Sequence, residues 1–230
     1  MDRIIDIVMA VSALVISVSF HEAAHAYAAW RMGDPTAKLM GRITLNPIKH
    51  LDPVGSVALP VILSLMGLPA FGWAKPVRVN PANFRELRKG DIIVSLAGVM
   101  ANLGLAIVTG LFLRLLFLSV DGRQTLSALQ LIWRMLPFFI TFIYLNLLLF
   151  VFNLIPVPPL DGGRVVSALF PHSYQAVARH FQAASLALLI ILMVTGSLDS
   201  FISAVVRPLF IVITGPDVLN AFIQMRYGMG

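Results

Sequence analysis

Apolar runs long enough to cross a lipid bilayer dominate this chain. Ile92–Val120 and Leu131–Ile155 each contain a single charged residue. Of the 230 residues, 58% are hydrophobic and 12% are charged, whereas soluble domains carry about 25% charged residues. Because a helix needs about 20 apolar residues to cross the hydrocarbon core, the sequence predicts an all-α polytopic membrane protein.

We expect five to six membrane segments in a single domain. The first apolar run follows Arg3, as a secretory signal would, but its helical pattern continues to Trp30, so we interpret it as a membrane helix. No linker or repeat divides residues 1–230. The core of the domain is expected at about 4–163, a surface helix at Arg164–Gln182 and C-terminal membrane helices at about 183–214. The remaining apolar stretches are Ile4–Phe20, Val54–Phe71, Ala183–Thr195 and Phe201–Ile213.

The basic residues of the chain are interpreted as signals of its orientation in the membrane. A formal net charge of +6 would suggest a nucleic-acid partner in a soluble protein, but here Lys and Arg lie beside the apolar runs. Basic residues in such positions set topology and face anionic lipid. We therefore expect the lipid bilayer, and no nucleic acid, as the partner of these charges.

The first apolar helix carries the motif with the most chemical information, His21-Glu22-Ala23-Ala24-His25. On a helix the two imidazoles share one face and can reach one Zn²⁺, with Glu22 beside it as a general base. Ionisable groups inside an apolar span cost about 2.5–3.5 kcal/mol each on insertion scales. A bound metal offsets that cost, so the motif predicts a zinc site.

A catalytic zinc site commonly has a third protein ligand. The chain has no Cys, so the candidates are nine Asp and the remaining histidines, His50, His172 and His180. Asp161 stands apart because three prolines precede it and two glycines follow it. Prolines end a helix, and such a break at membrane depth can turn a carboxylate toward metal on a neighbouring helix.

Together the two motifs, H-E-x-x-H and Asn153-Leu154-Ile155-Pro156-Val157-Pro158-Pro159-Leu160-Asp161-Gly162-Gly163, resemble the site-2 protease family of intramembrane zinc metalloproteases. The resemblance implies one zinc ion bound by His21, His25 and Asp161, with Glu22 as catalytic base. It implies a substrate or oxyanion contact for Asn102, although Val99 replaces the Pro of the family's G-P-x-x-N pattern, and a similar role is assigned to Asn153. The chain resembles compact members without PDZ or CBS domains.

Two short segments, Arg42–Asn46 and Lys75–Asn80, contain β-branched residues, and the last Asn of each is followed by Pro. This pattern predicts a strand followed by a turn in each segment. We expect them to form a small membrane-associated β element. A substrate helix must unwind before its peptide bonds can react. Thr44 and Val77 are therefore expected to lie on the edge where the unwound segment pairs as an added strand.

A zinc site shared by His21 and Asp161 constrains the topology. His21 lies late in the first helix and Asp161 follows Leu131–Ile155, so the chain between them must cross an even number of times. Ile92–Val120 and Leu131–Ile155 already make two crossings. Val54–Phe71 is therefore expected to enter and leave the membrane on one side. The positive-inside rule then places the N-terminus outside the cell membrane and the zinc site nearer the cytoplasmic face.

The sequence favours a zinc-dependent intramembrane endopeptidase that cleaves membrane-anchored substrates in or near their membrane-spanning segments, in regulated intramembrane proteolysis. Regulatory modules would come from separate proteins. Two alternatives use the same features. A divalent-metal transporter would also place His and carboxylates at membrane depth, and a catalytically silent scaffold would keep the fold without the chemistry. A zinc protease with a Glu ligand would require Glu86, which lies in a basic loop.

Overall fold

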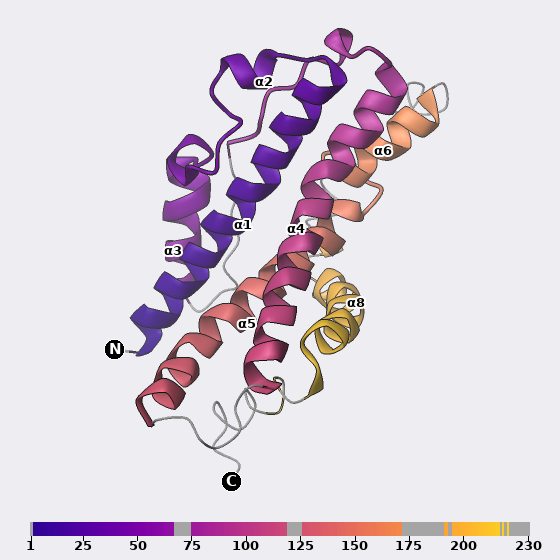
Figure 1. Cartoon of the computed structure of the whole chain (residues 1–230). Helices are drawn as coiled ribbons and strands as arrows, with labels where there is room; N and C mark the ends of the chain where they lie inside the picture. Colours follow the sequence, from indigo (N-terminus) through magenta and orange to yellow (C-terminus); the bar gives the residue numbers. More distant parts are fainter. Residues whose placement is uncertain are drawn as a thin grey trace.

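The computed structural model describes residues 2–66, 75–118, 126–171, 191–192, 195–216, 218 and 220. Three long helices form its frame: α1 (Asp2–Met32), α4 (Leu87–Leu118) and α5 (Leu126–Leu154). Each includes a stretch long and apolar enough to cross a membrane. Figure 1 shows α4 beside α1, with α5 crossing against both. The three runs predicted to form these helices do so, and helix α1 continues through Trp30 as expected.

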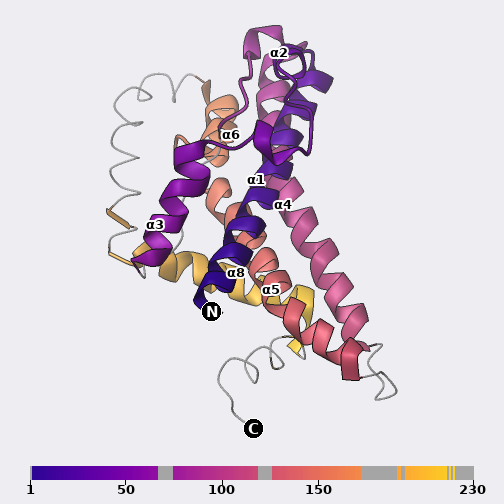
Figure 2. The same ribbon diagram turned by 90° about the vertical axis from the view of Figure 1, so that its left-hand side faces the viewer.

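The described residues contain three candidate spans rather than five to six. The run Phe201–Ile213 forms α8 (Ser197–Thr214), but Figure 2 shows α8 lying across the long helices. Its residues Ile202, Val206 and Phe210 are buried in the core against α5. This helix is apolar but shorter than the candidate spans, so the expected five to six segments are not confirmed within the described residues. The run Ala183–Thr195 lies almost wholly outside the described residues.

The residues on either side of Val54–Phe71, the segment predicted to enter and leave the membrane on one side, lie next to each other. It starts with a π-helical turn, η2 (Pro53–Ala58), continues into α3 (Leu59–Leu65), and its last part lies outside the described residues. The N–H of Lys75 donates to the carbonyl of His50 at 3.0 Å. The chain before the segment and the chain after it therefore meet at the same level of the molecule, as a re-entrant segment requires.

The two predicted strands do not form in the described residues. Arg42–Asn46 and Lys75–Asn80 are irregular. The Asn-Pro turns were predicted correctly: the side chains of Asn46 and Asn80 accept hydrogen bonds at the starts of η1 (Pro47–Lys49) and η3 (Pro81–Asn83). The β-branched residues form no ladder, because the groups that a strand would use bind elsewhere. The Val77 N–H donates to Glu22 and the Thr44 carbonyl accepts from His50.

The proline break after α5 behaves as predicted. Helix α5 ends at Leu154, and α6 (Asp161–Leu169) begins at the aspartate. Two glycines let α6 fold back onto the loop: a Cβ on Gly162 would lie 2.5 Å from the Ile155 carbonyl oxygen, and one on Gly163 would lie 2.6 Å from the Pro158 nitrogen. Helix α6 includes the first residues of the surface helix predicted at Arg164–Gln182. Residues 172–182 lie outside the described residues.

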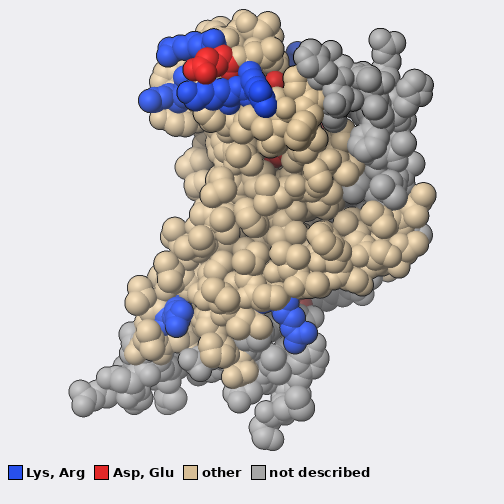
Figure 3. Space-filling model, turned by 90° about the vertical axis from the view of Figure 1, so that its right-hand side faces the viewer, with Lys and Arg blue, Asp and Glu red and all other residues tan. Residues whose placement is uncertain are grey.

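Basic residues gather at one end of the molecule, where α1 ends and α4 begins. Figure 3 shows this concentration of Lys and Arg. Exposed Arg85, Arg88 and Lys89 lie around the first turn of α4. At the same end, α2 (Thr36–Leu39) follows α1, and the fully buried Asp34 accepts hydrogen bonds from Asn80 and Asn83. This contact joins the end of α1 to the segment that leads into α4.

Candidate metal centre

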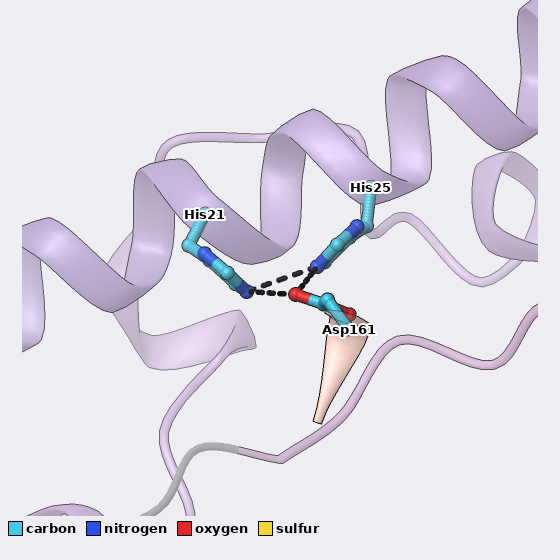
Figure 4. Close-up of side chains that lie close together, drawn as sticks. All are labelled: His21, His25 and Asp161. Carbon is cyan, nitrogen blue, oxygen red and sulfur yellow. Dashed lines mark hydrogen bonds and ion pairs between the residues drawn. The ribbon is translucent and has the colours of Figure 1, made fainter. Parts of the chain in front are cut away.

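Three side chains from two helices meet at one point. His21 and His25 lie one turn apart on α1, and Asp161 is the first residue of α6 (Figure 4). The two Nε2 atoms are 2.9 Å apart, and Oδ2 of Asp161 is 3.3 Å from His21 and 3.2 Å from His25. The residues predicted as zinc ligands from separate motifs, 136 positions apart at their closest, are thus brought together.

The hydrogen bonds on the far side of each ring fix which nitrogen faces this point. Nδ1 of His25 lies 2.7 Å from the Val94 carbonyl oxygen on α4. A carbonyl can only accept, so Nδ1 carries the hydrogen and Nε2 presents a lone pair. Nδ1 of His21 lies 2.5 Å from Oδ1 of Asn102 in the same way. Such hydrogen bonds to oxygen are typical of metal-binding histidines.

The grouped atoms fit a divalent cation. Two imidazole lone pairs directed at each other at 2.9 Å repel unless a positive charge lies between them. Oδ2 of Asp161 is buried and accepts no hydrogen bond from the residues that the structure describes. All three ligand atoms lie within 4.8 Å of one another. Two neutral imidazoles and one carboxylate form a donor set that catalytic zinc uses, with room left for a water.

The backbone of α4 passes directly beside the two rings at Gly98, next to the edges that carry Cε1 and Nε2. A Cβ on this residue would lie 2.7 Å from Cε1 of His25 and 2.8 Å from Cε1 of His21, and it would also overlap Nε2 of His25. Only glycine fits there. The sequence pattern contains Gly98, but sequence reasoning assigned it no role. Its place one helical turn before Asn102 is the signal that could have revealed it.

Glu22, the predicted base, lies beside the cluster on α1 and is held by a distant segment. Its Oε2 accepts a hydrogen bond of 2.8 Å from the N–H of Val77. That segment is anchored at both ends, since Lys75 binds the His50 carbonyl and Asn80 binds Asp34. The predicted strand is therefore an irregular strap that crosses Glu22.

Asn102 does not lie in an open position where the predicted substrate contact would place it. Its side chain is fully buried, its Oδ1 faces His21, and its Nδ2 donates to Oδ1 of Asn146 at 2.9 Å. Nδ2 of Asn146 in turn donates to Ser17 at 2.8 Å. Sequence reasoning missed Asn146 and Ser17, although an amide within the apolar run Leu131–Ile155 is costly without a partner.

The remaining predicted candidates lie elsewhere. Nδ2 of Asn153 donates to the Leu149 carbonyl of its own helix at 2.9 Å. His50 is almost fully buried, and its Nε2 donates to the Thr44 carbonyl at 2.8 Å, so that nitrogen is engaged by the backbone. His172 and His180 lie outside the described residues.

Comparisons with known proteins agree with this site. The model of peptidase family M50 matches residues 9–196. A Bacillus subtilis protein named "Putative zinc metalloprotease YwhC" is 42% identical over 182 residues, which cover 79% of this chain and 78% of that protein. "Putative zinc metalloprotease Rip2" of Mycobacterium tuberculosis H37Rv is 32% identical over 205 residues, 88% and 73% of the two chains. "Zinc metalloprotease MJ0392" of Methanocaldococcus jannaschii is 25% identical over 200 residues, 86% and 45%. No solved structure matches. The chain belongs to peptidase family M50, the site-2 protease family of zinc metalloproteases.

Proposed function

We propose that this protein is a zinc-dependent endopeptidase that hydrolyses peptide bonds in or near the membrane-spanning segments of membrane-anchored substrates, in regulated intramembrane proteolysis. The observation that carries the proposal is the meeting of His21, His25 and Asp161, with His21 and His25 on a helix long and apolar enough to span a membrane. Ionisable groups are costly at that depth and usually serve a function there.

In this proposal His21, His25 and Asp161 hold one zinc ion per chain through Nε2, Nε2 and Oδ2. Bound zinc lowers the pKa of a water molecule and polarises the scissile carbonyl. Glu22 takes the proton of the attacking water and later returns it to the leaving amine. The Val77 N–H holds one oxygen of the Glu22 carboxylate, which leaves the other oxygen to face the reacting water.

The strap Lys75–Asn80 remains the proposed place where an unwound substrate segment pairs. It is largely exposed, irregular and adjacent to Glu22. Because the Val77 N–H points at Glu22, the substrate would bind the backbone groups that face the other way. Thr44 is less suited to pairing, since its carbonyl accepts from His50 and its hydroxyl oxygen accepts from the Asn46 N–H.

We further propose that the protein lies in the cell membrane with its N-terminus outside and the zinc site nearer the cytoplasm. Residues 21 and 25 lie in the later half of α1, toward the end where basic residues gather (Figure 3). Basic residues are enriched on the cytoplasmic side of membrane proteins. Membrane-spanning substrates and separate regulatory proteins are the expected partners.

Cleavage by purified protein tests the proposal. Wild-type protein in detergent is incubated with candidate single-span substrates, with and without a zinc chelator, beside Glu22→Gln as a control. We expect cleavage that the chelator abolishes, that added zinc restores, and that Glu22→Gln lacks. Cleavage that persists in the chelator or in Glu22→Gln would overturn the proposal. Zinc binding without cleavage of any single-span substrate would overturn it too, in favour of a transporter or a silent scaffold.

A further inference from the structure

A continuous chain of buried hydrogen bonds runs from His21 through all three long helices. His21 on α1 faces Asn102 on α4 at 2.5 Å, and Asn102 donates to Asn146 on α5 at 2.9 Å. Asn146 donates both to Ser17 on α1 and to the Phe142 carbonyl of its own helix, each at 2.8 Å. Ser17, Asn102 and Asn146 are fully buried, so water cannot replace a missing partner.

The direction of every hydrogen bond in this network is fixed by the Phe142 carbonyl at the end remote from His21. The Phe142 carbonyl can only accept, so the NH₂ group of Asn146 must face it and Oδ1 of Asn146 must face Asn102. Asn102 must then present its NH₂ group to Asn146 and its Oδ1 to His21. His21 must therefore carry its hydrogen on Nδ1, which leaves Nε2 unprotonated.

The geometry points to Asn146 as a positioning residue for the metal centre, which selects the His21 tautomer through Asn102. Without Asn146, the Asn102 amide would be free to turn over and present its NH₂ group to Nδ1 of His21. The ring would then carry its hydrogen on Nε2, the atom that faces His25 and Asp161. The wrong tautomer must be reversed before a metal can bind.

The tautomer of His25 does not depend on a second side chain. Nδ1 of His25 donates directly to the Val94 backbone carbonyl at 2.7 Å, and a carbonyl cannot turn over. His21 meets a side-chain amide instead, whose oxygen and nitrogen ends have nearly the same shape. Only the neighbour of that amide can decide which end faces the ring. The dependence on a remote residue is thus specific to His21.

Zinc affinity measured by competition with a chromophoric chelator tests this inference, which rests on the proposed zinc site. Asn146→Leu keeps the size of the side chain and removes both polar groups. We expect its zinc affinity to fall about tenfold, the lower end of the range for residues that orient metal ligands. Leu147→Ala is the matched control, because Leu147 is equally buried next to Asn146 on α5. Its thermal stability should fall while its zinc affinity stays at the wild-type value.

A second background separates tautomer selection from a general packing effect. In Asn102→Asp the side chain can only accept, so it fixes the His21 hydrogen on Nδ1 without help from residue 146. Adding Asn146→Leu to Asn102→Asp should therefore change zinc affinity less than twofold. An equal tenfold loss in both backgrounds would overturn the inference, and so would wild-type affinity in Asn146→Leu alone.

Two further measurements keep the outcome clear. If Asn146→Leu does not fold, Asn146→Ser replaces it, because the shorter hydroxyl donates to the Phe142 carbonyl one turn back and no longer reaches Asn102. Its zinc affinity should also fall about tenfold, and wild-type affinity would overturn the inference. Cobalt(II) absorption should change in the Asn146 variants and not in Leu147→Ala. Failure of the wild-type protein to bind zinc would instead refute the proposed function.

Discussion

Gly98→Ala should weaken zinc binding with little effect on folding. The added Cβ would lie 2.7 Å from Cε1 of His25 and 2.8 Å from Cε1 of His21, whereas ordinary contact begins at 3.4 Å. The His25 ring must move by at least about 0.7 Å, because its Nε2 would lie closer still, and metal sites tolerate about 0.2 Å in ligand distance. Overpacking of this kind costs about 1–3 kcal/mol. The cost falls on zinc binding rather than on folding, because the rings can turn aside in the metal-free protein but not when they hold the metal. At 1.4 kcal/mol per factor of ten, zinc affinity should fall about 5- to 150-fold.

Gly104→Ala is the control on the same helix, because a Cβ at Gly104 meets no atom of the described residues within 4 Å. It should keep wild-type zinc affinity and gain about 0.5–1 kcal/mol of stability from the removal of a helical glycine. Chelator competition and thermal unfolding of both variants provide the comparison. Equal zinc affinity in Gly98→Ala and Gly104→Ala would show that α4 does not press against the two imidazoles.

Three further predictions address the strap, the buried carboxylate and the topology. Val77→Pro removes the N–H that binds Glu22. Hydrogen bonds to charged groups contribute about 1.5–3 kcal/mol, so cleavage should fall at least tenfold at unchanged zinc content. Normal turnover would contradict this role of Val77. Burial raises the pKa of Asp34, but hydrogen bonds from Thr36, Asn83 and Asn80 outweigh it and lower the pKa below its usual 3.8. The thermal stability that wild type gains over Asp34→Asn should therefore be present above pH 4 and shrink as the pH falls below it; a difference independent of pH would refute this contribution. Single Cys residues that replace exposed Leu39 and Lys89 should not react with an impermeant thiol reagent on intact cells, while a Cys that replaces Gly122 should react. Labelling at position 89 but not at position 39 would show that Val54–Phe71 crosses the membrane.

The three residues that meet at the candidate metal centre could be singled out because each stands in an informative local sequence. Helical periodicity alone puts His21 and His25 on one face, and the prolines before Asp161 alone end α5. Local patterns could single out Gly98 and Asn146 but not their roles, because those roles depend on which faces of α4 and α5 meet α1. Such contacts are properties of packing, and no local pattern encodes them.

The parts of the fold that the sequence did not predict have the same origin. The β-branched residues of Lys75–Asn80 favour a strand, but a strand needs a partner, and the Val77 N–H binds Glu22 instead. The hydropathy of Phe201–Ile213 is the same whether the helix faces lipid or protein. Its packing across α5 therefore could not be predicted from hydropathy (Figure 2).

The zinc content of purified variants tests the division of roles at the site most directly. The central claim is that His21, His25 and Asp161 bind the metal while Glu22 handles the proton. Metal analysis should give one zinc per chain in the wild type and in Glu22→Gln, and clearly less in Asp161→Asn, with cleavage lost in both variants. A full zinc content in Asp161→Asn would remove Asp161 from the ligands, and loss of zinc in Glu22→Gln would make Glu22 a ligand rather than a base.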